Sequence, residues 1–200
     1  MSKKHRVIII PGLGDDVNKM SWVIRLWRRH GLEPMIHSIG WHDGKKFQPK
    51  LRILIEMIDQ FTQDGDRISL VGCSAGASAA LNAFIERKNV LHRVINVCGR
   101  LRSGNQLGFR SFAARTVTSP SFAQSIKLFE KHEHLLSNQD RQKIMTVRAL
   151  FGDELVPTDT TILRGAYNTV IPTLEHALSI AMAVTLFSRP LITFLKKEDK

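Results

Sequence analysis

Five residues near the middle of the chain, Gly72-Cys73-Ser74-Ala75-Gly76, place two possible nucleophiles between two glycines. They follow a short apolar run and precede an alanine-rich stretch, so we expect a strand, a tight turn and a helix. Such a turn exposes its central side chain, and the residues two before and two after it must lack side chains that would collide with the strand and helix. Position therefore predicts Ser74 as the nucleophile, with Cys73 pointing away. A small-residue helix start that merely packs on a sheet would show the same pattern.

A nucleophilic serine needs a base, and the base needs a carboxylate that orients it. When the serine lies on such a turn, the order along the chain is serine, acid, histidine. Asp153 directly follows a glycine at the end of an expected strand, which puts its carboxylate at the same sheet edge as Ser74, and His176 is the only later histidine. We predict that Ser74, Asp153 and His176 form a catalytic triad. Asp159 and Glu154 are the alternative acids, and capping of a turn is the alternative role for Asp153.

The first apolar run ends in a glycine-rich turn, residues 11–15. Its backbone amides would face the nucleophile across the sheet, and we predict that the N–H groups of Leu13 and Ala75 form an oxyanion hole. Two glycines of this turn also begin a dinucleotide-binding fingerprint, but Val17 occupies its third glycine position and no acidic residue ends the second expected strand. The sequence has no phosphate loop and no cluster with metal-ligand spacing, so we expect neither a cofactor nor a metal.

These side chains can meet only where strands and helices bring them to one edge of a sheet. Short β-branched runs alternate with longer amphipathic ones, a pattern typical of parallel βαβ units. Strands are predicted at residues 6–10, 33–39, 67–72, 93–98, 145–151 and 165–171. Helices are predicted at residues 19–30, 49–62, 75–87 and 174–194, the last bent or broken at Pro190. Right-handed crossovers then give an α/β fold in which helices cover both faces of one mainly parallel sheet of about six strands.

Residues 99–144 interrupt this alternation, because these 46 residues contain no clear strand. A structureless loop of that length is improbable in a compact domain, so we expect short helices at residues 121–132 and 139–144. No repeat, low-complexity stretch or Pro/Gly-rich linker marks a second domain. The length of the chain suits a single domain, residues 1–200, in which residues 99–144 form a short helical cap-like insertion.

The composition, 43% apolar and 24% charged, indicates an ordinary soluble globular protein. Two cysteines are too few for a disulfide framework and favour a reducing compartment. The apolar run near the N-terminus is too short for a secretory signal. The longest apolar stretch, residues 177–187, reaches about half a bilayer span and predicts a buried core helix. We therefore expect a cytoplasmic protein without a transmembrane segment.

The net charge of +11 is large, but the basic residues are scattered and the chain has a single tyrosine. We therefore expect no specific nucleic-acid partner, since neither a basic arm nor an aromatic stacking platform is present. Between residues 99 and 143, eight basic residues, Arg110 and Arg115 among them, face only three acidic ones. Two interpretations stay open: a solvated surface whose aromatic residues pack on the sheet, or a cap that attracts an anionic substrate.

Four segments together resemble the α/β-hydrolase family: PGLGDD at residues 11–16, VGCSAG at 71–76, FGDELVP at 151–157, and the late His176. The likeness covers nearly the whole chain, as a compact version that begins at the family's third strand. Two features depart from the family's pattern: Pro11 stands where many members have histidine, and no glycine directly precedes His176. The resemblance implies that the first two strands are swapped in the sheet, that the insertion takes the place of a cap, and that esters, thioesters or amides are hydrolysed without a cofactor.

The predicted activity is that of a serine hydrolase of the esterase or thioesterase type, which acts on a small-molecule acyl substrate through an acyl-enzyme. Two alternatives remain open at this point. An acyltransferase would use the same triad and pass the acyl group to an alcohol or amine, and a binding protein would keep the fold without turnover.

Overall fold

The computed structural model describes residues 3–15 and 17–198. Its sheet has six strands, all parallel, in the order β2-β1-β3-β4-β5-β6. The strands are β1 (His5–Ile10), β2 (Glu33–Ile36), β3 (Arg67–Cys73), β4 (Leu91–Val97), β5 (Ile144–Ala149) and β6 (Tyr167–Ile171). All six predicted strands are confirmed, with small differences at their ends. The swapped order is confirmed too, because β1 lies between β2 and β3.

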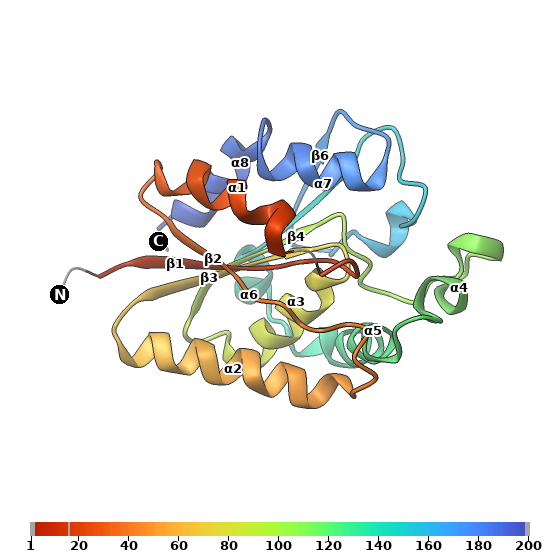
Figure 1. The fold of residues 1–200 in the computed structure, drawn as a ribbon, viewed down its shortest axis with the longest axis horizontal. Helices are drawn as coiled ribbons and strands as arrows, with labels where there is room; N and C mark the ends of the chain where they lie inside the picture. Colours follow the sequence, from red (N-terminus) through yellow and green to blue (C-terminus); the bar gives the residue numbers. More distant parts are fainter. Residues whose placement is uncertain (1–2, 16, 199–200) are drawn as a thin grey trace.

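Helices cover both faces of the sheet (Figure 1). One face carries α1 (Val17–Arg28), α7 (His176–Val184) and α8 (Ser188–Lys196), and the other carries α2 (Phe47–Gln63), α3 (Gly76–Arg87) and α5 (Pro120–His132). Two shorter helices, α4 (Phe112–Thr116) and α6 (Asn138–Gln142), complete the set of α-helices in the described residues. The predicted α/β architecture is therefore confirmed.

The two faces of the sheet bury two separate apolar clusters, and alternation along β1 shows why. Ile8 and Ile10 pack with the α2, α3 and α5 side, whereas Val7 and Ile9 pack with the α1, α7 and α8 side. Successive side chains of a strand point to opposite faces, so a strand covered on both faces is apolar at most successive positions. This is why Val7 to Ile10 of the first strand form a continuous apolar run rather than an alternating one.

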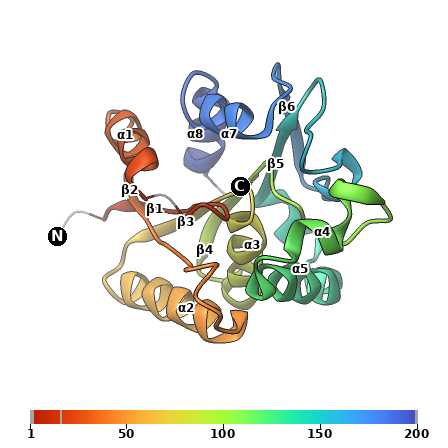
Figure 2. The same ribbon diagram turned by 45° about the vertical axis from the view of Figure 1, so that its right-hand side comes forward.

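The insertion between β4 and β5 contains helices, as predicted. Helix α5 begins where the Ser119 hydroxyl accepts a hydrogen bond from the backbone N–H of Phe122 and Pro120 occupies the first helical position. Helix α6 is shorter than predicted because Ile144 already belongs to β5. The prediction missed α4, which packs beside α5 near the sheet edge where the strands end (Figure 2).

The C-terminal helix is broken, but not at Pro190. Helices α7 and α8 meet at an angle of 53°, and the break lies at Thr185–Phe187. Pro190 lies in the first turn of α8, where backbone N–H groups have no partner within the helix, so its missing N–H costs no hydrogen bond. Pro190 therefore follows the break and does not cause it. Among the described residues, no single helix is long and apolar enough to cross a membrane, and α7 and α8 pass that test only when they are joined across the bend.

The apolar stretch at residues 177–187 is only partly buried, so the prediction of a buried core helix is confirmed only in part. Ala183 and Val184 pack against the sheet, whereas Leu178 and Leu186 are 49% and 76% exposed. The helix lies on the outside of the sheet, and a helix in that position buries only one side.

Candidate active site

Ser74 occupies the turn between β3 and α3. Its φ of 51° is in the left-handed region, which costs energy for a residue with a side chain. A Cβ added to Gly72 would lie 2.4 Å from the Cα of Ala77, and a Cβ on Gly76 would lie 2.1 Å from the carbonyl oxygen of Ile10. Only glycine fits at either position. The strained turn is thus held between the strand and the helix, and it presents the Ser74 hydroxyl beyond the end of the strand.

Cys73, the other possible nucleophile, points into the core. Its side chain is 1% exposed and packs with the apolar cluster on the α1, α7 and α8 side. Burial raises the pKa of the Cys73 thiol to about 12, so the thiolate that a nucleophile requires does not form near neutral pH. Of the two candidates in this turn, only Ser74 reaches a cavity.

The imidazole of His176 lies between Ser74 and Asp153. The Nδ1 atom is 2.7 Å from Oδ2 of Asp153, and the Nε2 atom is 2.8 Å from Oγ of Ser74. Because an ionised carboxylate can only accept, Nδ1 carries the proton and Nε2 is left to accept from the serine hydroxyl. The structure therefore brings together the three side chains predicted as a triad, in the arrangement that proton transfer from Ser74 to His176 requires.

Asp153 is held by its own turn. Gly152, with a φ of 104°, turns the chain after β5, and Oδ1 of Asp153 accepts hydrogen bonds from the backbone N–H groups of Leu155 and Val156, each at 2.8 Å. Burial alone would raise the pKa of this carboxyl, but the hydrogen bond from His176, the positive charge of that ring when it is protonated and the two amides together lower it. Asp153 is therefore ionised at neutral pH and fixed in direction.

The two alternative acids lie elsewhere. Asp159 is exposed and accepts hydrogen bonds from the side-chain amide of Gln106, without contact to His176. Glu154 accepts a hydrogen bond from the backbone N–H of His176 at 2.9 Å, so it holds the start of α7 rather than the imidazole. This contact was not predicted. The sequence shows a second carboxylate next to Asp153, but it does not show which helix begins beside that carboxylate in the folded chain.

The two residues predicted to supply the oxyanion hole, Leu13 and Ala75, both lie close to Ser74. Leu13 lines the same small cavity as Ser74 and His176, and Ala75 directly precedes α3. Within the described residues, neither N–H donates a backbone hydrogen bond to another group. A Cβ on Gly12 would lie 2.9 Å from the Cβ of Ser74, which shows how closely this turn approaches. Asp16, the last residue of the predicted PGLGDD segment, lies outside the described residues.

The cavity beside Ser74 is small. Its volume is about 30 Å³, and its wall includes Phe122, Leu155 and Val156 together with the guanidinium-bearing Arg100 and Arg115. This space takes no more than one or two water molecules. A larger substrate must therefore extend beyond this cavity or displace part of its wall.

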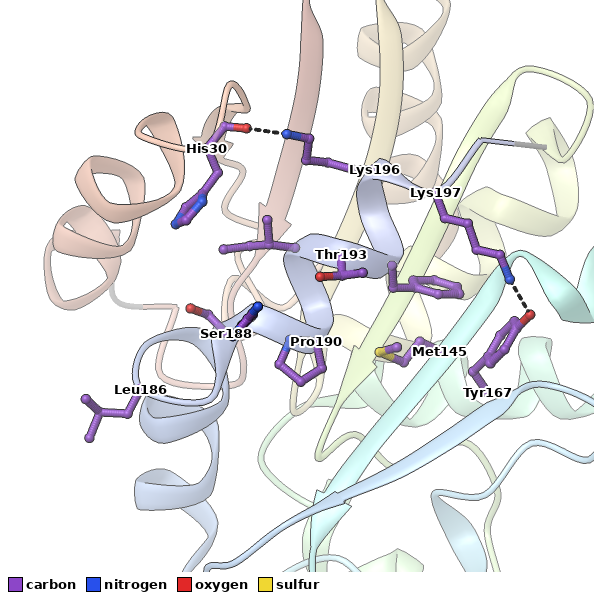
Figure 3. A pocket seen from close by; sticks show the side chains of 12 residues that line it. His30, Met145, Tyr167, Leu186, Ser188, Pro190, Thr193, Lys196 and Lys197 are labelled. Carbon is purple, nitrogen blue, oxygen red and sulfur yellow. Dashed lines mark hydrogen bonds between the residues drawn. The ribbon is translucent and has the colours of Figure 1, made fainter. Parts of the chain in front are cut away.

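A much larger groove, of about 1040 Å³, lies along α8 and beside the amino-terminal ends of β5 and β6 (Figure 3). Met145, Tyr167, Pro190 and Phe194 line it, and Lys197 donates a hydrogen bond to the Tyr167 hydroxyl at 2.7 Å. None of its lining residues in the described chain forms a nucleophile–base pair. Size alone would favour this groove, but the hydrogen-bonded serine, histidine and aspartate lie at the smaller cavity.

The residues that the structure describes contain no group of three His, Cys, Asp or Glu side chains able to hold a metal ion. The side chains gathered around Ser74 thus have acid–base and nucleophilic chemistry, not the composition of a metal centre.

No model of a known protein family matches the sequence, and no curated protein is similar to it in sequence. Solved structures are similar in fold. A structure described with LipS and LipT, two metagenome-derived lipolytic enzymes, has a TM-score of 0.70 at 11% identity and covers 98% of this chain and 95% of its own. Est1E from Butyrivibrio proteoclasticus has a TM-score of 0.67 at 14% identity, covering 96% and 87%. MGS-MChE2, an α/β-hydrolase enzyme from a lagoon-sediment metagenome, has a TM-score of 0.62 at 16% identity, covering 97% and 91%.

These likenesses and the strand order show that the chain has the α/β-hydrolase fold. The fold expected from the four sequence segments is confirmed.

Proposed function

We propose that this protein is a serine hydrolase that cleaves a carboxylic ester or thioester through an acyl-enzyme. The observation that carries the proposal is the His176 ring, hydrogen-bonded on one side to Ser74 and on the other to Asp153. The descriptions of two structural neighbours, a lipolytic enzyme and an α/β-hydrolase enzyme, support the same class.

In the first half of the reaction, Oγ of Ser74 attacks the acyl carbon and its proton passes to Nε2 of His176. The carbonyl oxygen becomes negatively charged, and the N–H groups of Leu13 and Ala75 stabilise it together with the N-terminus of α3. When this intermediate collapses, the bond to the leaving alcohol or thiol breaks, and His176 returns the proton to the leaving atom. The acyl group is then bonded to Ser74.

In the second half, water replaces the leaving group. His176 takes a proton from the water molecule as the water oxygen attacks the acyl carbon. When this second intermediate collapses, the bond to Ser74 breaks, His176 returns the proton to Oγ of Ser74, and the carboxylic acid leaves. Asp153 remains ionised throughout, because its partners lower its pKa, and it stabilises the imidazolium that forms in each half.

The small cavity limits the acyl group. The cavity beside Ser74 has a volume of about 30 Å³. A short acyl group therefore displaces less of the wall formed by Phe122, Leu155 and Val156 than a long one does. We therefore expect kcat/KM to be highest for short acyl chains and to fall as the chain lengthens.

The acyl-enzyme can be tested with 4-nitrophenyl acetate. We expect a burst of 4-nitrophenolate close to one equivalent per protein when deacylation is slow, or an acetyl group on the peptide that contains Ser74 after acid quenching. Ser74→Ala should show neither. Turnover by Ser74→Ala at the wild-type rate would refute the proposal.

The same assay separates hydrolysis from acyl transfer. Adding an alcohol or amine acceptor should leave the acid as the main product of a hydrolase. A new ester or amide as the main product would instead identify an acyltransferase on the same three residues.

A further inference from the structure

A cation shares the cavity with the nucleophile. Arg115, in α4 of the insertion, lines the same small cavity as Ser74 and His176. In the part of the chain that the structure describes, its guanidinium forms no ion pair and no hydrogen bond, and only its backbone N–H donates, to the carbonyl oxygen of Ser111. By contrast, Arg102 and Arg141 of the same insertion both pair with Glu133. Arg115 is thus a charged group beside the reacting atoms whose hydrogen-bond donors are not used.

A second guanidinium lies in the wall of the same cavity. Arg100 is 1% exposed, and its donors bind the backbone carbonyl oxygens of Arg102, Ser103 and Arg110 at 2.8–3.1 Å. These acceptors are neutral, so they satisfy the donors without cancelling the charge. Burial lowers the pKa of Arg100, and the charges of Arg115 and Arg110 act in the same direction.

Three carboxylates of the insertion and of the segment after β5 have other partners. Glu130 accepts hydrogen bonds from Ser103, Asp159 accepts them from Gln106, and Asp153 is bound to His176. Asp159 and Glu130 partly offset the charge on Arg100 from a distance. Within the described residues, however, no carboxylate contacts the guanidinium of Arg100 or Arg115.

Apolar side chains of Phe122, Leu155 and Val156 also line the cavity. An acyl substrate in this cavity would therefore meet both apolar side chains and an unpaired guanidinium. Because the cavity is only about 30 Å³, any group that reaches both Ser74 and Arg115 must span a short distance.

We propose that Arg115 binds a carboxylate carried by the substrate, a few bonds from the acyl carbon that Ser74 attacks. The inference rests on the proposed hydrolase function and specifies its substrate class. A guanidinium binds a carboxylate through two parallel hydrogen bonds, an arrangement that fixes orientation as well as charge. Arg100 adds a second positive charge behind the first, and the apolar side chains contact the short carbon chain between ester and carboxylate.

Two pairs of esters test this proposal and locate the carboxylate. Mono-4-nitrophenyl succinate carries it on the acyl group, and its methyl ester is the neutral partner. 4-Acetoxybenzoate carries it on the leaving group, and methyl 4-acetoxybenzoate is the neutral partner. For each pair, the measured quantity is the ratio of kcat/KM for the anionic ester to kcat/KM for the neutral one.

Arg115→Gln should lower this ratio by about tenfold or more in one of the two pairs, since hydrogen bonds to charged groups are among the stronger ones. Arg115→Lys should restore part of it, because the charge returns without the paired donors. Lys131→Gln is the matched control: it removes one charge from the same insertion at an exposed position outside the cavity wall. Equal ratios in Arg115→Gln and Lys131→Gln for both pairs would overturn the proposal.

A binding measurement separates this inference from the proposed hydrolase function. Titration calorimetry of Ser74→Ala with the intact anionic esters should show tighter binding than with their neutral partners, and Arg115→Gln in that background should remove the difference. This result would support the anion site even if wild-type protein hydrolysed no ester. If the wild-type protein hydrolyses neutral esters but Arg115→Gln changes neither the ratio for either pair nor the binding, the hydrolase function is supported and the anion site is refuted.

Discussion

In the part of the chain that the structure describes, His176 and His5 each form a hydrogen bond with a serine, one toward each end of the sheet. At the carboxyl end, Nε2 of His176 lies 2.8 Å from Oγ of Ser74. Toward the amino end, Nε2 of His5 lies 2.9 Å from Oγ of Ser69. The two contacts are nearly equal in length, so length does not explain why only one of them would be catalytic.

The surroundings of the two serines differ. Ser69 lies within β3, between β1 and β4, and its side chain is fully buried. Ser74 follows the same strand, on a strained turn at the start of α3, and lines a cavity. A substrate carbonyl can approach Ser74 but not Ser69, and only Ser74 has a helix N-terminus beside it to stabilise an oxyanion.

The surroundings of the two histidines differ as well. Asp153 accepts a hydrogen bond from Nδ1 of His176, whereas no carboxylate in the described chain is hydrogen-bonded to His5, whose ring packs edge-on against His92. Burial, followed by the charges of His92 and Arg67, lowers the pKa of His5 to about 4, so this ring is a weak base. A serine–histidine hydrogen bond is thus not enough: a carboxylate and access to substrate distinguish the proposed active site.

The largest expected effect comes from removing each serine in turn. Ser74→Ala should lower ester turnover by roughly 10³-fold or more, and the double variant with His176→Ala should be little worse, because the two groups act as one unit. Ser69→Ala should keep turnover close to wild type and instead lower the free energy of unfolding by about 1–3 kcal/mol, because His5 loses its partner. Steady-state kinetics with 4-nitrophenyl acetate and urea unfolding measure the two effects. If Ser74→Ala and Ser69→Ala lost turnover equally, the proposal that only Ser74 is catalytic would be contradicted.

Removing the carboxylate should have a smaller effect on turnover than removing the serine. Asp153→Asn keeps an acceptor beside His176 but removes the charge that stabilises the imidazolium and favours the reactive tautomer. We expect turnover below wild type but above that of Ser74→Ala, measured with the same ester. Asp159→Asn is the matched control and should retain turnover, since Asp159 binds Gln106. Full activity of Asp153→Asn, with loss in Asp159→Asn, would reassign the acid.

The smallest effect concerns stability at the other site. The ordinary pKa of histidine is 6.5, and that of His5 in the folded protein is about 4, so between these values the unfolded chain binds a proton that the folded chain does not. The free energy of unfolding should therefore fall as the pH decreases from 6.5 to about 4, and His5→Gln should reduce this slope. Burial also lowers the pKa of His37, so part of the slope should remain.

Urea unfolding at several pH values measures this slope, and His134→Gln, at an exposed position, is the control. An unchanged slope in His5→Gln would show that this histidine does not stay neutral in the folded protein.

Much of the fold could be predicted because its signals are local. Short, continuous apolar runs predicted the strands. The glycines on either side of Ser74 predicted the tight turn, since larger side chains cannot fit there. The order of Ser74, Asp153 and His176 along the chain identified the candidate triad, because all three follow strands that end at one edge. Each of these signals depends on a few neighbouring residues or on the order of the elements.

The remaining features depend on contacts between distant segments. The break at Thr185–Phe187 precedes Pro190, and no local pattern distinguished a proline that ends a helix from one that begins the next. The contact of Glu154 with the backbone of His176 and the position of Arg115 beside Ser74 arise only when loops meet in space. The sequence showed that the insertion is basic, but not that one arginine lines the cavity without a partner.

The most direct test of the proposed active site is labelling with a fluorophosphonate, followed by mass spectrometry of the digested protein. These reagents bond to a serine that a neighbouring base activates. We predict a single modified residue, Ser74, with Ser69 and Cys73 unmodified, and no labelling of Ser74→Ala. A label on another residue, persistent labelling of Ser74→Ala, or no reaction of the folded wild-type protein would contradict the account.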